Sequence, residues 1–315
     1  MAVGDLGGPG GQPVLSTPLL AAPSALSQHR SLLRAVAVFV KPHIVVTFVL
    51  VGVAGSLLAG AGLRGGAPVL RVVAVAAAVA LLSAGAECWT NILDRRIDAL
   101  MARTAKRPLV TGEISTREAA VLASALCLAG LALAATLGPV PVVFLGLGLV
   151  NNVVIYSLLT KRASPWSVVL GSLVAPLTLW AGYTAVAVPL SAAAWLLGGM
   201  VGVWIFVHIW VIALRYRADY AQAQVPMAPL VWSRAKLAFA LGSSGLLMAA
   251  FGTGALLEIG GTAGRWASLA VALASALVTV RAVLSTRQER PSSSLVHAIT
   301  AYLIIVLGLA IGCVL

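Results

Sequence analysis

Residues 67–91 read APVLRVVAVAAAVALLSAGAECWTN, and residues 92–109 continue as ILDRRIDALMARTAKRPL. The first segment carries only two charged residues, Arg71 and Glu87. A helix needs roughly 20 apolar residues to cross the hydrocarbon core of a membrane, so this segment is long enough to do so. The second segment is dense with acidic and basic side chains. The sequence therefore predicts a membrane-spanning helix that leads into a charged segment at the membrane surface.

Eight further apolar segments of similar length occupy the rest of the chain. Of its 315 residues 60% are hydrophobic and 10% are charged, whereas a soluble protein has about 25% charged residues. This composition excludes a soluble globular protein and a disordered one. Because an unclosed strand leaves its backbone unpaired in lipid, the spans must be helices. We predict an all-α membrane protein, a nine-transmembrane-helix bundle with spans near residues 43–63, 67–91, 118–138, 140–159, 167–187, 191–214, 235–257, 265–284 and 296–315.

The positions of Lys and Arg predict the orientation of this bundle. With a cytoplasmic N-terminus, 18 of the 21 basic residues fall on the cytoplasmic side and only Arg64, Arg71 and Arg265 on the other. Cytoplasmic loops are enriched in Lys and Arg, so we expect a multi-pass protein of the cell (inner) membrane with its C-terminus outside. Residues 1–35 are predicted to be a disordered cytoplasmic tail and residues 36–315 one transmembrane domain. The net charge of +12 reflects topology and anion binding, and does not indicate a nucleic-acid partner.

The charged segment contains two aspartates at helical spacing. Asp94 and Asp98 are four residues apart and project from one face of a helix, with Asn91 one turn earlier. Two such carboxylates repel each other unless a cation lies between them, and Mg²⁺ prefers carboxylate, water and phosphate oxygens. Arg103 and Arg107 follow, and a divalent metal with basic side chains is typical of diphosphate recognition. The alternative is a solvated helix end on which the aspartates pair with neighbouring arginines.

Several motifs resemble those of one protein family. The run DRRIDALMARTAKRPL at residues 94–109 is similar to the first aspartate motif of the UbiA superfamily of intramembrane prenyltransferases, and most like its heme O synthase branch. Further stretches resemble motifs of this branch in the same order, so that the resemblance covers roughly residues 36–235: VKPHI at 40–44, IYSLLTKR at 155–162, HIW at 208–210 and DYAQAQVPMAP at 219–229.

The resemblance implies a function and a set of site residues. It implies a farnesyl transferase in the lipid bilayer that uses farnesyl diphosphate and Mg²⁺ to alkylate a vinyl group of heme b, which gives heme O. The metal ligands and catalytic residues would be Asp94, Asp98 and Asp219, and the diphosphate contacts Asn91, Arg103, Arg107, Lys161 and Arg162. His208 would bind or orient the acceptor. The residues alone leave three alternatives open. Asp219 could form an ion pair with a nearby arginine, and His208 could be a hydrogen-bonded core residue. The basic residues could serve topology only, which applies to Arg103, Arg107, Lys161 and Arg162.

Some positions depart from the pattern of the branch. Thr178 and Leu179 stand where it has two prolines, and Val207 replaces the proline before His208. These departures leave open an enzyme of the same type that acts on a quinone precursor or another aromatic acceptor. A membrane transporter is the alternative of another class, but the charged groups gather at one face and not at the midplane where transporters bind substrates. Glu87 lies inside a span, where it needs a cavity or a partner, and has no assigned role.

Overall fold

The computed structural model describes residues 37–60, 66–288 and 291–315, and these residues form helices and connecting turns without strands. The predicted tail, residues 1–35, and Arg64 lie outside the described residues. The helices are α2 (Pro42–Ala59), α3 (Gly66–Leu100), α4 (Pro108–Thr111), α5 (Thr116–Ala135), α6 (Pro139–Val150), the π-helix η1 (Asn151–Thr160), α7 (Ser167–Gly171), α8 (Val174–Thr184), α9 (Ala192–Arg215), α10 (Arg217–Gln222), α11 (Ala228–Val231), α12 (Arg234–Ile259), α13 (Gly261–Ser285) and α14 (Ser293–Val314).

The predicted nine spans are confirmed. Within the described residues, nine helical segments are long and apolar enough to cross a membrane; α6 and η1 together form the fourth and α7 and α8 the fifth. Large apolar side chains such as Phe239, Trp266 and Leu273 are exposed on their outer faces. Contiguous apolar surface of this kind is unfavourable in water and favourable in lipid. The chain is therefore a multi-pass membrane protein.

Helix α3 is longer than the predicted span. It continues past the expected end at Asn91 to Leu100, a total of 35 residues. The apolar pattern stops near Trp89, but the residues that follow tolerate a helix and the next proline is Pro108. The aspartate motif therefore begins on the last turns of a continuous helix, which holds its side chains more rigidly than a loop would.

Helices α2 and α8 approach so closely that only glycine fits at their contact. A Cβ on Gly55 would lie 2.0 Å from the carbonyl oxygen of Leu179, and one on Gly182 would lie 1.9 Å from that of Gly52. The Ser56 hydroxyl also donates to the Gly182 carbonyl at 3.0 Å. Small residues and interhelical hydrogen bonds of this kind stabilise helix pairs in membranes, where lipid removes most of the hydrophobic driving force.

The fifth span is interrupted between α7 and α8. Asn151 of η1 bridges the interruption, because its Nδ2 donates to the Leu170 carbonyl at 2.9 Å and its Oδ1 accepts from the Val174 amide at 3.1 Å. The π-helical segment η1 packs against α7. Long π-helices are rare, and π geometry is frequent at functional sites. Both irregular segments contribute to the cavity described below.

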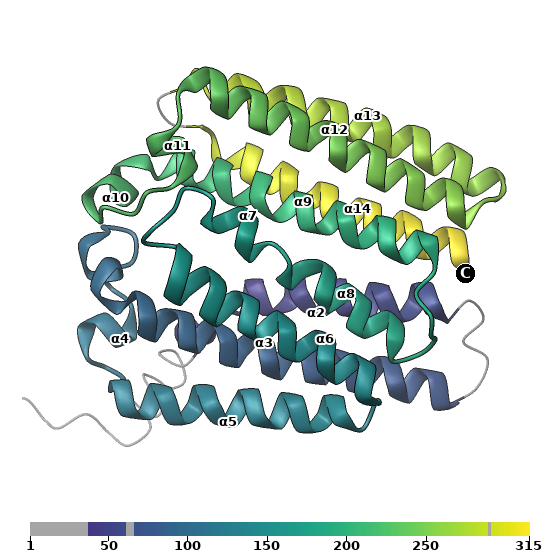
Figure 1. The fold of residues 1–315 in the computed structure, drawn as a ribbon, viewed down its shortest axis with the longest axis horizontal. Helices are drawn as coiled ribbons and strands as arrows, with labels where there is room; N and C mark the ends of the chain where they lie inside the picture. The colour runs from purple at the N-terminus through teal and green to yellow at the C-terminus, as the bar shows by residue number, and fades with distance from the viewer. Residues whose placement is uncertain (1–36, 61–65, 289–290) are drawn as a thin grey trace, which may run out of the picture.

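The ends of the bundle differ (Figure 1). The long helices lie side by side, and the short helices α4, α10 and α11 gather at one end, on the left of the view. The C-terminal end of α3 and the connection from η1 to α7 lie at the same end, whereas the C-terminus of the chain lies at the opposite end. The fold therefore brings the polar motifs of distant segments together at one end of the bundle.

Candidate active site

Four polar side chains form a row along one face of α3, here called the α3 polar row: Glu87, Asn91, Asp94 and Asp98. Their spacing of three or four residues places them on one side of the helix. All four are buried, between 2% and 8% exposed. A buried carboxylate is costly unless it is paired, so this row requires partners from other segments.

Two basic residues pair with the aspartates of this row. The Lys161 ammonium donates to Oδ2 of Asp94. Nη1 of Arg107 donates to Oδ2 of Asp98 at 2.5 Å and to Oδ1 of Asn91 at 3.2 Å. The structure therefore brings together five of the predicted site residues in one buried cluster. In this cluster the bases that neutralise the aspartates come from other segments, and not from the adjacent Arg95 and Arg96.

The turn that follows α3 positions Arg107. The Thr104 hydroxyl donates to the Asp98 carbonyl at 2.9 Å and closes the turn below the aspartate. Arg107 is the N-cap residue of α4, and Pro108 follows at the first helical position, where proline is favoured. The conformation of the chain before α4 is thus fixed by local hydrogen bonds and by proline, which directs the guanidinium back toward α3.

Lys161 is positioned by the end of η1. Its ammonium lies 5.4 Å from the centroid of the Tyr156 ring. Burial is the largest single influence and disfavours the charged ammonium, but the Asp94 carboxylate together with Tyr156 and Tyr220 outweighs it, and the pKa of Lys161 is raised above its usual range. The next residue, Arg162, donates to the carbonyl of Leu93 and so anchors the connection from η1 to α7 on α3. Lys161 therefore stays cationic throughout the physiological pH range.

The two aspartates also offer oxygen ligands for a hard cation. Oδ1 of Asp94 is buried and has no hydrogen-bond partner among the described residues, and the ion pair of Asp98 uses only its Oδ2. Mg²⁺ takes one or two carboxylates and completes its octahedron with water and substrate phosphate, so these donors fit Mg²⁺.

Asp219 is not part of this cluster. It lies on α10, is half-buried, and makes no ion pair with any residue of the described chain. In the same part of the chain, no three His, Cys, Asp or Glu side chains lie close enough to bind one metal ion. The three predicted metal ligands therefore do not converge on a single point, although α10 lies at the same end of the bundle as the C-terminal end of α3 (Figure 1).

A cavity of about 680 Å³ opens beside the α3 polar row. Its lining comes from α2, α3, η1, α7, α8, α9 and α14, and Glu87 of the row is part of it. Three histidines from three helices also line it, His43, His208 and His297. Its volume lies within the range of roughly 300–1,000 Å³ that is typical of small-molecule sites.

Two arginines, Arg103 and Arg215, line the cavity around Tyr216. The guanidinium carbons of Arg103 and Arg215 lie 4.8 and 5.7 Å from the ring centroid of Tyr216, and all three residues line the cavity. Nη1 of Arg215 also donates to the Pro291 carbonyl at 2.6 Å. The structure thus places Arg103 at the cavity and outside the ion-pair cluster of the α3 polar row. These cation–π contacts fix positive charge beside an apolar space.

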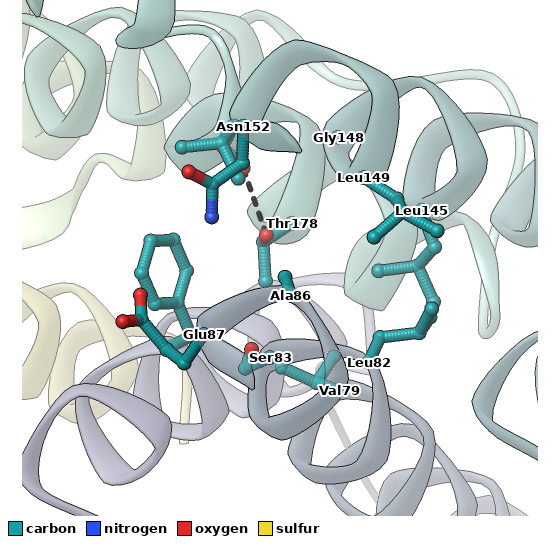
Figure 2. A pocket seen from close by; sticks show the side chains of 12 residues that line it. Val79, Leu82, Ser83, Ala86, Glu87, Leu145, Gly148, Leu149, Asn152 and Thr178 are labelled. Carbon is teal, nitrogen blue, oxygen red and sulfur yellow. Dashed lines mark hydrogen bonds between the residues drawn. The ribbon is translucent and has the colours of Figure 1, made fainter. Parts of the chain in front are cut away.

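A smaller cavity adjoins the large one. Phe48, Glu87, Asn152 and Val174 line both cavities. In Figure 2, Glu87 and Asn152 lie at one side of the smaller cavity and leucine side chains lie at the other. Oε2 of Glu87 accepts from the Lys41 ammonium at 2.7 Å. Glu87, which the sequence left without a role, therefore has a cationic partner and lines both cavities.

Sequence reasoning missed several residues of this site. Lys41 and His43 lie in the VKPHI motif that supported the resemblance, but a motif does not show which side chains meet. Tyr216 follows Arg215 at the end of a span, and His297 is an ionisable residue near the start of the last one. For Tyr216 and His297 the sequence offers only their positions near the ends of spans, and these positions do not indicate that the two residues line one cavity.

Known proteins share the fold of this chain. Residues 36–311 match the UbiA prenyltransferase family. The chain belongs to this family. The match begins before the first span and extends into the ninth, so the predicted superfamily and helical-bundle architecture are confirmed.

Individual members of the family give more detail. The protoheme IX farnesyltransferase of Thermoplasma acidophilum is 39% identical over 181 residues, which are 57% of this chain and 63%, less than two thirds, of that protein. That of Thermoplasma volcanium is 35% identical over 214 residues, 68% of this chain and 74% of that protein. A UbiA homologue from Archaeoglobus fulgidus, solved bound to GPP and Mg²⁺, has a TM-score of 0.71 at 17% identity and covers 89% of this chain and 99% of its own. This last similarity shows a common fold.

Proposed function

We propose that this protein is a farnesyl transferase that moves the farnesyl group of farnesyl diphosphate to a vinyl group of heme b, which gives heme O. The observation that supports this most is the buried ion-pair cluster at the end of α3, the helix whose Glu87 also lines a largely apolar cavity of about 680 Å³. The names of the two Thermoplasma relatives support the identity of donor and acceptor.

The diphosphate is proposed to bind at the α3 polar row. Asp94 and Asp98 would hold Mg²⁺, which when bound offsets the charge of the diphosphate. Lys161 and Arg107 already contact these carboxylates, and their N–H groups can stabilise the phosphate oxygens as the C–O bond breaks and its electron pair leaves with the diphosphate. Asn91 accepts from Arg107 and keeps that guanidinium oriented.

Residues outside the α3 ion-pair cluster are proposed to complete the diphosphate site. Arg103 lies at the cavity and would contact the diphosphate from there. Asp219 makes no ion pair within the described chain and would serve a second Mg²⁺ on the opposite side of the diphosphate. Arg162 would act by position, because its hydrogen bond to Leu93 keeps Lys161 next to α3.

The apolar cavity is proposed to receive the prenyl chain and the acceptor. Its apolar walls exclude water from the allylic cation until the terminal vinyl carbon forms a bond to C1 of the farnesyl group. Water then adds to the inner vinyl carbon and loses a proton, which gives the hydroxyethylfarnesyl substituent. His208, in the wall of the cavity, would orient the acceptor.

The positions that depart from the heme O synthase pattern lie outside the lining of the large cavity. Leu179 and Val207 are buried in the helix core, and neither lines the large cavity. Thr178 lines only the smaller cavity, and its hydroxyl donates to the Val174 carbonyl at 2.8 Å. These departures therefore give no reason to replace heme by another acceptor.

The orientation in the membrane is part of the proposal. The C-terminal end of α3, the connection from η1 to α7 and the short helices α10 and α11 lie at one end of the bundle, and the C-terminus of the chain lies at the other (Figure 1). Because 18 of the 21 basic residues belong to the predicted cytoplasmic side, we infer a cell-membrane protein with the site and N-terminus facing the cytoplasm.

The test is a transfer assay with the purified protein in lipid nanodiscs, radiolabelled farnesyl diphosphate, Mg²⁺ and either heme b or 4-hydroxybenzoate. Label should appear in a porphyrin product, and Asp94→Asn should abolish it. Glu258→Gln, an exposed acid on α12, is the matched control and should retain full turnover. Label on the phenol but none on heme would refute heme as the acceptor, and label on neither would refute prenyl transfer to either class.

A further inference from the structure

His208 is held in place without using its ring nitrogens. Its imidazole stacks on Trp204, with 5.0 Å between centroids and 18° between planes, and the Trp204 indole donates to the Ile299 carbonyl of α14 at 2.7 Å. Nδ1 of His208 is buried, and it has no hydrogen-bond partner in the described chain. Buried structural histidines normally satisfy their polar atoms. With Nδ1 enclosed, Nε2 is the nitrogen available to a molecule in the cavity.

The face of α9 that lines the cavity has one ligand atom between apolar side chains. Ile205, His208, Ile209 and Ile212 follow at helical spacing, and Arg215 ends the row. His208 and Arg215 are seven residues apart, roughly 10 Å along the helix axis. An apolar surface with a nitrogen ligand at its middle and a cation at its end matches a flat apolar macrocycle that carries a central metal and carboxylates on one edge.

The cavity does not resemble a site for a bare metal ion. His43, His208 and His297 all line it, but no three ligating side chains among the described residues converge on one point. His43 and His297 are exposed, whereas His208 is half-buried with its Nδ1 enclosed. A single imidazole can serve as an axial ligand to a metal whose other ligands belong to a macrocycle.

We propose that this cavity binds an iron porphyrin with Nε2 of His208 as an axial ligand to the iron and with Arg215 beside its propionates. This rests on the proposed function for the presence of heme and specifies how the acceptor is held. Arg215 is suited to this contact, because its bond to the Pro291 carbonyl and its position over Tyr216 hold the guanidinium at the cavity.

The iron ligand is tested by titrating hemin into the purified protein in nanodiscs, without farnesyl diphosphate, and recording absorption and electron paramagnetic resonance spectra. The wild type should give a histidine-ligated ferric spectrum. His208→Ala should lose it, and added imidazole should restore it, which also shows that the variant is folded. The matched control His297→Ala, at the same cavity, should keep the wild-type spectrum. A wild-type spectrum in His208→Ala, or its loss in His297→Ala alone, would overturn the assignment.

The propionate contact is tested by comparing hemin with its dimethyl ester. The wild type should bind hemin about tenfold more tightly than the ester, and Arg215→Gln should bind both equally. Equal affinities in the wild type would remove Arg215 from the proposal.

These binding experiments are independent of turnover. If the protein farnesylates heme but His208→Ala gives the same spectrum as the wild type, His208 is not the iron ligand and the proposed function stands. A histidine-ligated spectrum that depends on His208, without farnesylation of heme, would refute the proposed function and keep the site.

Discussion

Replacing Asp98 by Asn separates the charge of this residue from its shape. Oδ2 of Asp98 accepts from Nη1 of Arg107 at 2.5 Å, and its side chain is 6% exposed. A hydrogen bond to a charged group contributes about 1.5–3 kcal/mol to stability, and the Asn carbonyl still accepts from Arg107. We therefore expect Asp98→Asn to lower the free energy of unfolding by about 1–2 kcal/mol. Stabilities are typically about 5–15 kcal/mol, so the variant should remain folded.

The same substitution should affect turnover far more than stability. It removes a charged ligand from the proposed Mg²⁺ and diphosphate site, and removing one preorganised electrostatic group typically costs about 2.7–4 kcal/mol of transition-state stabilisation. At about 1.4 kcal/mol per tenfold change, turnover should fall by about 10²–10³-fold. The Mg²⁺ concentration that gives half-maximal activity should also rise, because one hard oxygen ligand has lost its charge.

The assay measures farnesyl transfer by wild type, Asp98→Asn and Glu113→Gln over a series of Mg²⁺ concentrations, with the folded fraction of each determined by size-exclusion chromatography in detergent. Glu113 is an exposed acid in the turn after α4 and is the control for loss of one negative charge at this end of the bundle. Near-normal turnover of Asp98→Asn with an unchanged Mg²⁺ requirement would refute the metal site at the α3 polar row.

Two further predictions concern packing and protonation. Gly182→Ala should destabilise the bundle by about 3 kcal/mol in a denaturant titration, because the added Cβ would overlap a backbone carbonyl of α2. The control Gly146→Ala, on the open face of α6, should not lower the stability. Equal stability of the two variants would contradict the close α2–α8 contact. Because the pKa of Lys161 is raised, its ion pair contributes its full stability below the ordinary lysine pKa and loses it only as pH rises through the raised value. Acetic anhydride at pH 9 should therefore modify exposed Lys106 but spare Lys161, as read by mass spectrometry, and Asp94→Asn should remove that protection; rapid labelling of Lys161 in the wild type would contradict it.

The sequence predicts those features that depend on local pattern. Nine spans follow from the length of the apolar segments, and the shared face of Asn91, Asp94 and Asp98 follows from helical spacing. Partners across the bundle do not follow from such patterns. Lys161 meets Asp94 across 67 positions of the chain and Lys41 meets Glu87 across 46, and hydropathy contains no information on which helices become neighbours.

The cavity was not predictable for a related reason. A histidine in a span indicates a need for a partner or a cavity, which is true of His208, but the presence of three histidines in the lining of one cavity depends on how α2, α9 and α14 pack. The fifth span has a local break signal in Pro176, which cannot donate to the Ser172 carbonyl, but the bridge from Asn151 of the neighbouring span across that break does not follow from the sequence.

The residues of the α3 polar row lie at different depths within the bundle, because they follow one another along a single helix. Glu87 and Asp94 are seven residues apart, about 10 Å along the axis, and each pairs with a lysine from another segment. Asp94 belongs to the ion-pair cluster at the end of the bundle, whereas Glu87 lies where the two cavities meet. A single rigid helix thus fixes the distance between the proposed diphosphate site and the apolar cavity. Because α3 has no break between these residues, substitutions that kink it there should separate diphosphate binding from transfer even when every polar side chain is retained.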